Sequence, residues 1–503
     1  MKEVKFWVKS DLNGFFGLFT NNLTNIISMA SLLIFVVGFP TEVVYRQIIP
    51  ATGISIFVAS AYYTYMAYKL AKKTGRDDVT ALPAGPSVTH MFLIVFTVLG
   101  PIYWTTGDVE LALNAGIFWC FLESIIEILG AFVGKKIRDA IPRIAMLGSL
   151  AGISITYIAL NPAFNSFAVP YIGLVALIII LLGLVGKAKM PFNIPTGLVA
   201  IVFGIAAGWL SGYMKVEPLL TSFENLGLAI PLPSISRIIS GATEAAPFIT
   251  AALPLGIYNA FETMDNLESA AVAGDEYPTA EAMLNDGITS MIAALFGSPF
   301  PTACYIGHAG WKESGARIGY SFANAVAILI ITSLGLISVL LNLIPVEAIY
   351  PILIFIGITI TTQAFTSSDM KYIPAAIMAI IPHMADWSKN IADNTLSTVG
   401  TNATNVGASL LASNGVVYEG MKVLGTGSIL VGMILGSFVV FIIDKDYRKA
   451  AITGIIGFVL TFFGIIHAGS VGINANVQME IAYAIVTLIF IFYYFKEQKE
   501  KQV

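Results

Sequence analysis

The sequence predicts an all-α polytopic membrane protein built from two repeats. Three observations predict this fold class. The composition is one that only a bilayer can solvate, apolar runs long enough to cross a membrane recur along the chain, and two irregular segments repeat each other at a fixed spacing.

The composition excludes a large soluble protein. Of the 503 residues, 56% are hydrophobic and 12% are charged, and the mean hydropathy is +0.81. Soluble domains carry about 25% charged residues. The net charge of −4 indicates no nucleic-acid surface, and the two cysteines, Cys120 and Cys304, form neither a disulfide framework nor a metal-binding spacing. The basic first ten residues precede a long apolar run without a cleavage site, so no signal peptide is expected.

Two segments, GRDDVTALPAG at 75–85 and GSPFPTACYIG at 297–307, repeat each other. Four identities at an offset of 222 positions relate them: Gly75, Thr80, Ala81 and Gly85 recur as Gly297, Thr302, Ala303 and Gly307. Each segment is too irregular for a helix and precedes an apolar run. An extended segment that leads into a half-helix, once in each half, is typical of secondary transporters that bind substrate between the two helix N-termini at mid-membrane. Chance is the alternative, since glycine and alanine are common here.

Sixteen apolar runs are read as spans, of which 80–100 and 299–312 begin as extended chain. The runs are 18–39, 50–71, 80–100, 110–133, 140–160, 170–186, 192–211, 246–271, 279–296, 299–312, 317–342, 345–364, 371–387, 420–443, 449–468 and 477–495. Seven of them precede the polar, proline-containing connector 212–245. An odd number inverts the second half relative to the first.

The expected domains are therefore a first repeat at 1–211, the connector 212–245, a second, inverted repeat at 246–443, and two additional spans with a basic tail at 444–503. The polar, weakly charged stretch 389–419 is expected to be an outside loop.

The charges set the orientation. With both termini in the cytoplasm, only Arg46, Lys215, Arg237, Lys389 and Lys422 face outward, so 22 of the 27 lysines and arginines lie inside. Such a bias follows the positive-inside rule and would be lost if one span were missed.

The densest group of polar residues in a span is 258–268, YNAFETMDNLE. Glu262 lies three residues before Asp265 and four before Asn266, so each pair shares a helix face. Buried carboxylates there could accept N–H donors of a ligand, hold a proton or bind a cation. The alternative is that Glu262 is neutral or paired and joins two domains. Glu268 lies nearer the end of the span and is expected at the interface.

Backbone and side chains of the repeated segments complete the expected substrate site. Helices that begin near Gly85–Ser87 and Gly307–Ala309 would direct N–H groups at a ligand, with Ala84 in the preceding extended chain. Ser87, Thr302 and Tyr305 are candidate polar contacts, with helix capping or packing as the alternative for each.

His90 and His308 lie just inside these half-helices. Each could bind substrate or carry a proton, or could equally be a packed hydrogen-bonding residue. Glu123 and Glu127 share a face of the span 110–133 and face either a channel or a basic partner. The candidates for proton or cation coupling are Glu262, Asp265, His90 and His308. No nucleotide-binding, zinc-protease or nucleophile motif is present, so no enzyme, cofactor or metal is expected.

The chain resembles the xanthine/uracil permease (nucleobase–ascorbate transporter) family, especially its adenine–guanine–hypoxanthine branch. The resemblance covers roughly residues 15–385 and rests on VTALPAG at 79–85, FETMDNL at 261–267, AMLNDG at 282–287 and FGSPFPTACYIG at 296–307. It implies seven plus seven inverted spans in a core and a gate domain, often as a homodimer. It also implies Glu262 as the carboxylate that binds the base, beside Asn266.

The sequence departs from that family at one position. The family's tenth span carries a second acidic or amide residue, which falls here on Ile306 or Gly307. His308 is the nearest substitute. The related SulP anion transporters share the architecture and also lack this acid.

The resulting hypothesis is a plasma-membrane secondary transporter for a nucleobase, such as a purine, uracil or xanthine, coupled to H⁺ in preference to Na⁺. The first alternative is an anion or carboxylate transporter of SulP-like architecture, which two helix N-termini favour and Glu262 opposes unless it is protonated. The second is a membrane sensor that binds a ligand without transporting it.

Overall fold

The computed structural model describes residues 4–87, 90–91, 94–190, 196–244, 249–366 and 368–500. The described chain is predominantly helical. In the first half the helices are α1 (Asp11–Ser31), α2 (Thr41–Val43), α3 (Ile49–Thr74), α5 (Gly100–Thr106), α6 (Val109–Ala140), α7 (Arg143–Ile153), α8 (Asn161–Ala168), α9 (Pro170–Ile180), α10 (Thr196–Leu210), α11 (Val216–Ser222) and α12 (Ile235–Glu244). Wider π-helical turns at Leu32–Val37, Val44–Ile48, Val95–Leu99, Ser154–Leu160 and Leu181–Val185 extend several of them.

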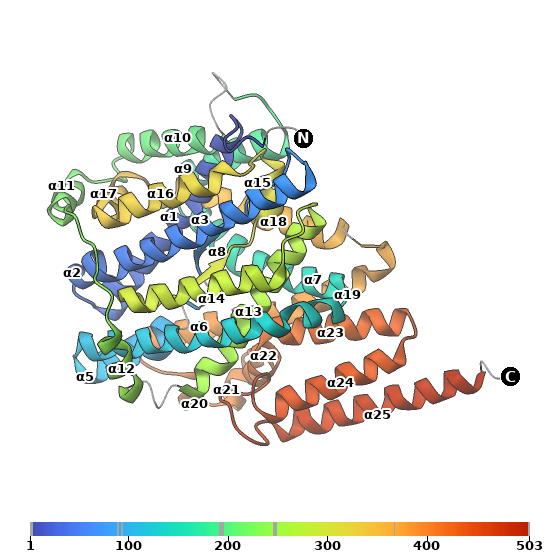
Figure 1. Cartoon of the computed structure of the whole chain (residues 1–503). Coiled ribbons are helices and arrows are strands. Elements are labelled where there is room, and N and C mark those ends of the chain that lie inside the picture. The colour runs from blue at the N-terminus through green and yellow to red at the C-terminus, as the bar shows by residue number, and fades with distance from the viewer. Residues whose placement is uncertain are drawn as a thin grey trace.

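The second half contains thirteen further helices among the described residues (Figure 1). They are α13 (Ile249–Val272), α14 (Thr279–Phe296), α15 (His308–Glu313), α16 (Gly319–Ser333), α17 (Leu336–Leu343), α18 (Tyr350–Thr366), α19 (Ile373–Thr398), α20 (Ala403–Val406), α21 (Ala408–Ser413), α22 (Tyr418–Gly425), α23 (Ser428–Ile443), α24 (Tyr447–Phe462) and α25 (Val477–Glu500).

Several of these elements are membrane-like in length and composition. Among the described residues, five helices are long and apolar enough to cross a bilayer, and the bent pairs α16–α17 and α22–α23 raise the number to seven. The helices follow the order of the predicted spans, but fewer than the sixteen expected runs form helices of membrane-spanning length, and Pro170–Val185 and Thr196–Leu210 are shorter apolar helices. The boundary expected at 245–246 lies outside the described residues.

Two predicted spans are sharply bent. The run 317–342 forms α16 and α17, which meet at 99°, and the run 420–443 forms α22 and α23, which meet at 81°. A glycine with positive φ lies at each bend, Gly335 (φ 70°) and Gly427 (φ 76°). Glycine adopts this conformation without steric cost, and a helix cannot continue through it.

The expected loop 389–419 is partly helical, which corrects that prediction. Helix α19 continues to Thr398, and the short helices α20 and α21 follow. Asn402 caps α20 by accepting a hydrogen bond from the Asn405 N–H at 2.8 Å. Asparagine is a strong helix N-cap, so the polar composition that suggested a loop is also the composition of capped short helices.

One two-stranded sheet joins the halves. Strands β1 (Ala84–Pro86) and β2 (Thr302–Cys304) pair antiparallel, with Ala84 opposite Cys304 and Pro86 opposite Thr302. The Tyr305 N–H donates to the Pro83 carbonyl at 2.8 Å and extends the pairing by one step. The predicted short strands are therefore present, and they pair with each other.

Positions related by the offset of 222 coincide at the ends of two helices, but they do not coincide in the two strands. Gly75 caps α3 and Gly297 caps α14, both with positive φ. From these caps β1 begins nine residues on and β2 five residues on. The second half-helix, α15, begins at His308 as predicted. In the first half the Met91 N–H donates to the Ser87 carbonyl at 3.0 Å.

Two groups of helices hold the site. Helices α3, α6, α13 and α14 pack together around the strand pair. Helix α16 packs against α3, and α1 packs against α16 and β1. Helices α7, α18, α19 and α23 form a second packed group, which α13 also contacts. The C-terminal α24–α25 pair lies side by side beyond α23 (Figure 1).

Candidate functional site

Helix α13 presents polar side chains to strand β2. The Asn266 amide donates to the Cys304 carbonyl at 2.9 Å. Glu262 lies one helical turn before Asn266 on the same face, within electrostatic range of Tyr305 and Cys304. Glu262 is 7% exposed and Asp265 is fully buried. The face predicted from the sequence therefore lies against the paired strands.

Several oxygens on this face have no hydrogen-bond partner among the described residues. They are Glu262 Oε2, both carboxylate oxygens of Asp265, and Asn266 Oδ1. A buried carboxylate without a donor or cation is costly, by several kcal/mol per charge. These groups therefore need protons, a cation or a donor from a ligand.

Ser87 and His90 form a buried chain with Glu123 on α6. The Ser87 hydroxyl lies 2.6 Å from His90 Nδ1, and His90 Nε2 lies 3.0 Å from Glu123 Oε1. His90 and Glu123 both lie within electrostatic range of Glu262. Both His90 and Glu123 thus belong to the same site as the α13 carboxylates.

The strand residues contribute mainly through close packing. A Cβ at Gly85 would lie 2.2 Å from the Tyr305 ring and 2.3 Å from Asn22 Oδ1. The Tyr305 hydroxyl accepts a hydrogen bond from Asn25 at 2.7 Å, and Asn22 donates to the Ala84 carbonyl at 3.0 Å. Helix α1 therefore supports the strands through two asparagines that the sequence analysis did not single out.

The side chain of Thr302 binds its surroundings. Its hydroxyl donates to Ser55 on α3 at 2.8 Å, while its backbone N–H donates to the Ser290 hydroxyl at 3.0 Å. Both partners are fully buried. This is the packing alternative for Thr302, and it fixes β2 between α3 and α14.

His308 points to the loop between α13 and α14. Its Nε2 lies 3.0 Å from Asp275, whose carboxylate also binds Lys312 at 2.7 Å and Arg76 at 3.0 Å and accepts the Thr80 N–H at 3.0 Å. Asp275 is fully buried. We call this set, Arg76, Asp78, Asp275, His308 and Lys312, the loop clamp, since it ties the segment before β1 to α15.

Electrostatics hold the clamp carboxylates ionised. A hydrogen bond from Arg76 lowers the pKa of Asp78 to about 2. Burial raises the pKa of Asp275, but hydrogen bonds and charges from His308 and Lys312 outweigh it and hold that pKa below its ordinary value. Both groups lie in loops outside the helices.

The start of α15 offers hydrogen-bond donors. The N–H groups of Gly307, His308 and Ala309 donate to no acceptor among the described residues. Gly307 has φ 126°, a conformation that a side chain disfavours. Donors at the start of α15 and bare carboxylates on α13 therefore flank the same strand, β2.

Two further carboxylates lie beside the site, and the sequence analysis gave them no role in coupling. Glu127 on α6 and Asp286 on α14 both contact the Thr263 hydroxyl, at 3.3 and 2.9 Å. Asp286 also accepts the Cys304 N–H of β2 at 2.8 Å. The spacing of Glu123 and Glu127 showed that they share a face, but only the packing of α6 against α13 and α14 shows where Glu127 points.

Glu268 makes a structural pair. It is 6% exposed and forms an ion pair with Arg143 at the start of α7. Its carboxylate packs against the second helix group, and its expected position at the membrane interface stays a prediction.

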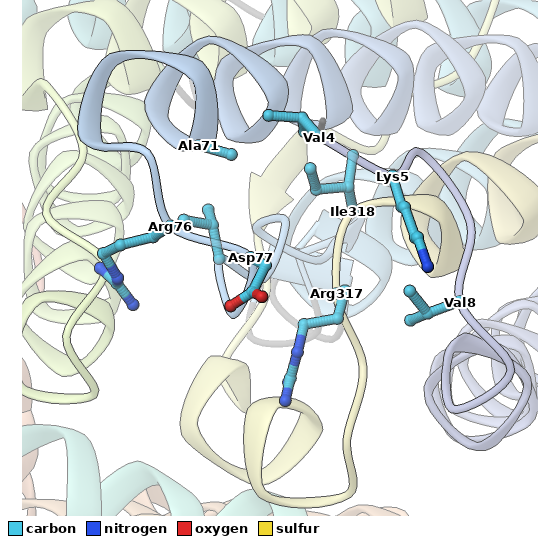
Figure 2. A pocket seen from close by; sticks show the side chains of 9 residues that line it. Val4, Lys5, Val8, Ala71, Arg76, Asp77, Arg317 and Ile318 are labelled. Carbon is cyan, nitrogen blue, oxygen red and sulfur yellow. The ribbon is translucent and has the colours of Figure 1, made fainter. Parts of the chain in front are cut away.

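A separate cavity of about 430 Å³ lies between the N-terminal segment, the end of α3 and the residues before α16. Figure 2 shows Lys5, Arg76, Asp77 and Arg317 around it, together with the apolar side chains of Val4 and Ile318. None of the predicted substrate-binding residues lines this cavity.

The solved structures that resemble this chain include transporters. No family model and no curated protein matches the chain. Similar solved structures include the transmembrane domain of a cyanobacterium bicarbonate transporter, BicA (TM-score 0.43, 15% identity, covering 85% of this chain and 97% of that one). They also include SLC26A9 (0.47, 13%, 75% and 62%) and the murine Slc26a9 anion transporter in the inward-facing state (0.41, 11%, 75% and 65%).

The helices and the paired strands confirm the fold class, and the comparisons correct the family. The chain has the candidate spans of a multi-pass helical membrane protein, with one short strand from each half paired in a single sheet among the described residues. The resemblance to xanthine/uracil permeases is wrong, because the similar structures named above are anion transporters. Its motifs are short and rich in glycine, alanine and proline, which strand–half-helix segments require for geometric reasons, and the acid expected at Ile306 or Gly307 is missing.

Proposed function

We propose that the chain is a secondary transporter that carries a small anion together with H⁺ across the plasma membrane, with both termini in the cytoplasm. One observation carries the proposal. The free N–H groups at the start of α15 and the bare carboxylates of Glu262 and Asp265 flank the same strand.

This juxtaposition makes anion binding depend on protons. Backbone N–H groups at a helix start attract an anion, but an ionised Glu262 beside them repels it. Protonation of Glu262 removes the repulsion and turns the carboxyl into a hydrogen-bond donor. Anion and proton then favour the same state of the site, which is the condition for coupled transport.

A neutral nucleobase is the second candidate substrate. The four unpartnered oxygens of Glu262, Asp265 and Asn266 favour it, because a planar base presents several ring and amino N–H donors. In this case the Glu262 carboxylate binds the substrate directly and must be ionised, whereas for an anion it must be protonated. The two candidates therefore predict opposite effects of neutralising this one side chain.

The test is thermal stabilisation of the purified protein by chloride, nitrate, sulfate, uracil and adenine, with wild type and Glu262→Gln side by side. A ligand that binds the folded state raises its apparent stability by mass action. Glutamine mimics the protonated carboxyl. We expect an anion to stabilise the wild type more at acidic than at neutral pH, and to stabilise Glu262→Gln equally at both.

Loss of a uracil or adenine shift in Glu262→Gln would instead establish the nucleobase as substrate. No shift with any anion at acidic pH, in either protein, would refute the anion proposal. Glu281→Gln is the matched control, because Glu281 lies in the first turn of α14, away from the site, in an ion pair with the exposed Lys69.

A further inference from the structure

The hydroxyl of Thr263 lies between two carboxylates but has only one proton to donate. Its Oγ1 lies 3.3 Å from Glu127 Oε1 and 2.9 Å from Asp286 Oδ2. All three side chains are fully buried. One hydroxyl can donate to one acceptor, so with both carboxylates ionised one of these oxygen–oxygen contacts would contain no proton.

The other hydrogen bonds distinguish the two carboxylates. Asp286 accepts from the Tyr63 hydroxyl, from the Cys304 N–H at 2.8 Å and from Thr263. Among the described residues, Glu127 has one other donor, the Asn259 amide at 3.2 Å. A carboxylate with several donors is stabilised in its ionised form, and the one with fewer donors takes the proton more readily.

Asn259 is the neighbouring amide that can pair with Glu127 in either protonation state. Its Nδ2 points at Glu127 Oε2, and its Oδ1 is buried without a hydrogen-bond partner among the described residues. A half-turn of the amide would place Oδ1 at Glu127 instead, where a proton on Oε2 would satisfy it. The amide therefore accommodates a proton on Glu127 after a half-turn.

We propose that Glu127, Thr263 and Asp286 form a proton-binding site separate from Glu262, in which Glu127 holds the proton and Thr263 relays a hydrogen bond to an ionised Asp286. A proton from the aqueous phase binds a carboxylate oxygen of Glu127. On deprotonation it returns to the aqueous phase. No other bond forms or breaks.

The site is linked to the candidate substrate site by one residue of β2. The Cys304 N–H donates to Asp286, and the Cys304 carbonyl accepts from Asn266, one helical turn from Glu262. A change of charge on the Glu127–Asp286 pair therefore acts on the strand that flanks the substrate. The link between the proton site and substrate binding rests on the proposed function. The location of the proton on Glu127 does not.

The ionisable groups that face this pair come from every packed element. They are Tyr63 on α3, Cys120 and Glu123 on α6, Glu262 on α13 and Cys304 on β2. None of these side chains is a lysine or arginine. A second negative charge on Glu127 would thus meet no fixed positive charge from them.

The test is infrared difference spectroscopy of the purified protein between about pH 5 and about pH 9, which detects the carbonyl stretch of a protonated carboxyl without any substrate. We expect the wild type and the surface control Glu281→Gln to show this band. Glu127→Gln should lose one component of it, and Thr263→Val should shift that component, because both carboxyls remain while the relay is removed.

An unchanged band in Glu127→Gln, or a component lost only in Asp286→Asn, would overturn the assignment. Glu127→Gln keeps the shape of the side chain, and Thr263→Val provides a second readout if the first variant does not fold. Should the band behave as expected while no tested solute stabilises the protein, the proton site stands and the proposed function fails.

Discussion

At the scale of single residues, Gly85 shows why the strands need the residues they have. Its Cα approaches Tyr305 and Asn22 so closely that any Cβ would overlap both, although its own φ is unexceptional. The sequence marked Gly85 as part of a repeated motif. The reason for the glycine is this close approach, which only the packing of α1 against both strands reveals.

We predict that Gly85→Ala destabilises the protein by about 1–3 kcal/mol, the usual cost of an overpacked core. The measurement is the thermal unfolding midpoint in detergent. Gly472→Ala is the control, since a Cβ there meets nothing within 4 Å. Equal midpoints for the two variants would show that the strands move apart without cost.

His308 illustrates the limit of residue patterns. The sequence predicted its position at the start of a half-helix. It left two interpretations of the side chain, substrate or proton binding and a packed hydrogen-bonding residue. The structure places its Nε2 on Asp275 within the loop clamp. The residue that decides this, Asp275, lies 33 positions away, and no local pattern connects the two.

At the scale of elements, the loop clamp joins the segment before β1 to α15. Arg76 contacts both Asp78 and Asp275, and Lys312 lies 3.7 Å from Asp78. Four charged side chains from three segments thus fix the entry to one strand and the half-helix that follows the other. Such a network keeps the two halves of the site in register.

The clamp predicts a particular sensitivity to acid. The folded-state pKa of Asp78, about 2, lies below its ordinary value of 3.8. A carboxyl with a depressed pKa stabilises the fold above its unfolded pKa and loses that contribution as pH falls towards the folded value. We therefore expect the stability difference between wild type and Asp78→Asn to shrink from about pH 4 to about pH 2.

Thermal unfolding midpoints of both proteins across this range provide the measurement. Parallel curves for the two proteins would contradict the role given to Asp78. The side chain is 48% exposed, so the effect should be small and should weaken further in high salt.

At the scale of the whole molecule, composition and spacing predicted the class of fold and the order of its elements. The repeated glycines Gly75 and Gly297 are left-handed helix caps, a local property that the repeat did not by itself identify. The strand positions shifted because the connections after these caps differ in length. The bends at Gly335 and Gly427 could not be predicted, since a glycine in an apolar run also occurs in straight helices.

The candidate site was predicted in part. The face of Glu262 and Asn266 follows from helical periodicity, and the structure places it against β2. The sequence did not predict that Glu127 and Asp286 lie close together. They are 159 positions apart, and only the contact of α6 with α14 brings them together. Substrate chemistry depends on the protonation of these carboxylates, which no residue pattern fixes.

The central claim is that a small anion and H⁺ move together. The most direct measurement places the protein in liposomes that contain a pH-sensitive dye and imposes an inward gradient of chloride, nitrate or sulfate. We predict that one of these anions acidifies the lumen in the wild type, that uracil does not, and that Glu262→Gln abolishes the acidification. Anion entry without acidification, or acidification driven by uracil alone, would contradict the claim.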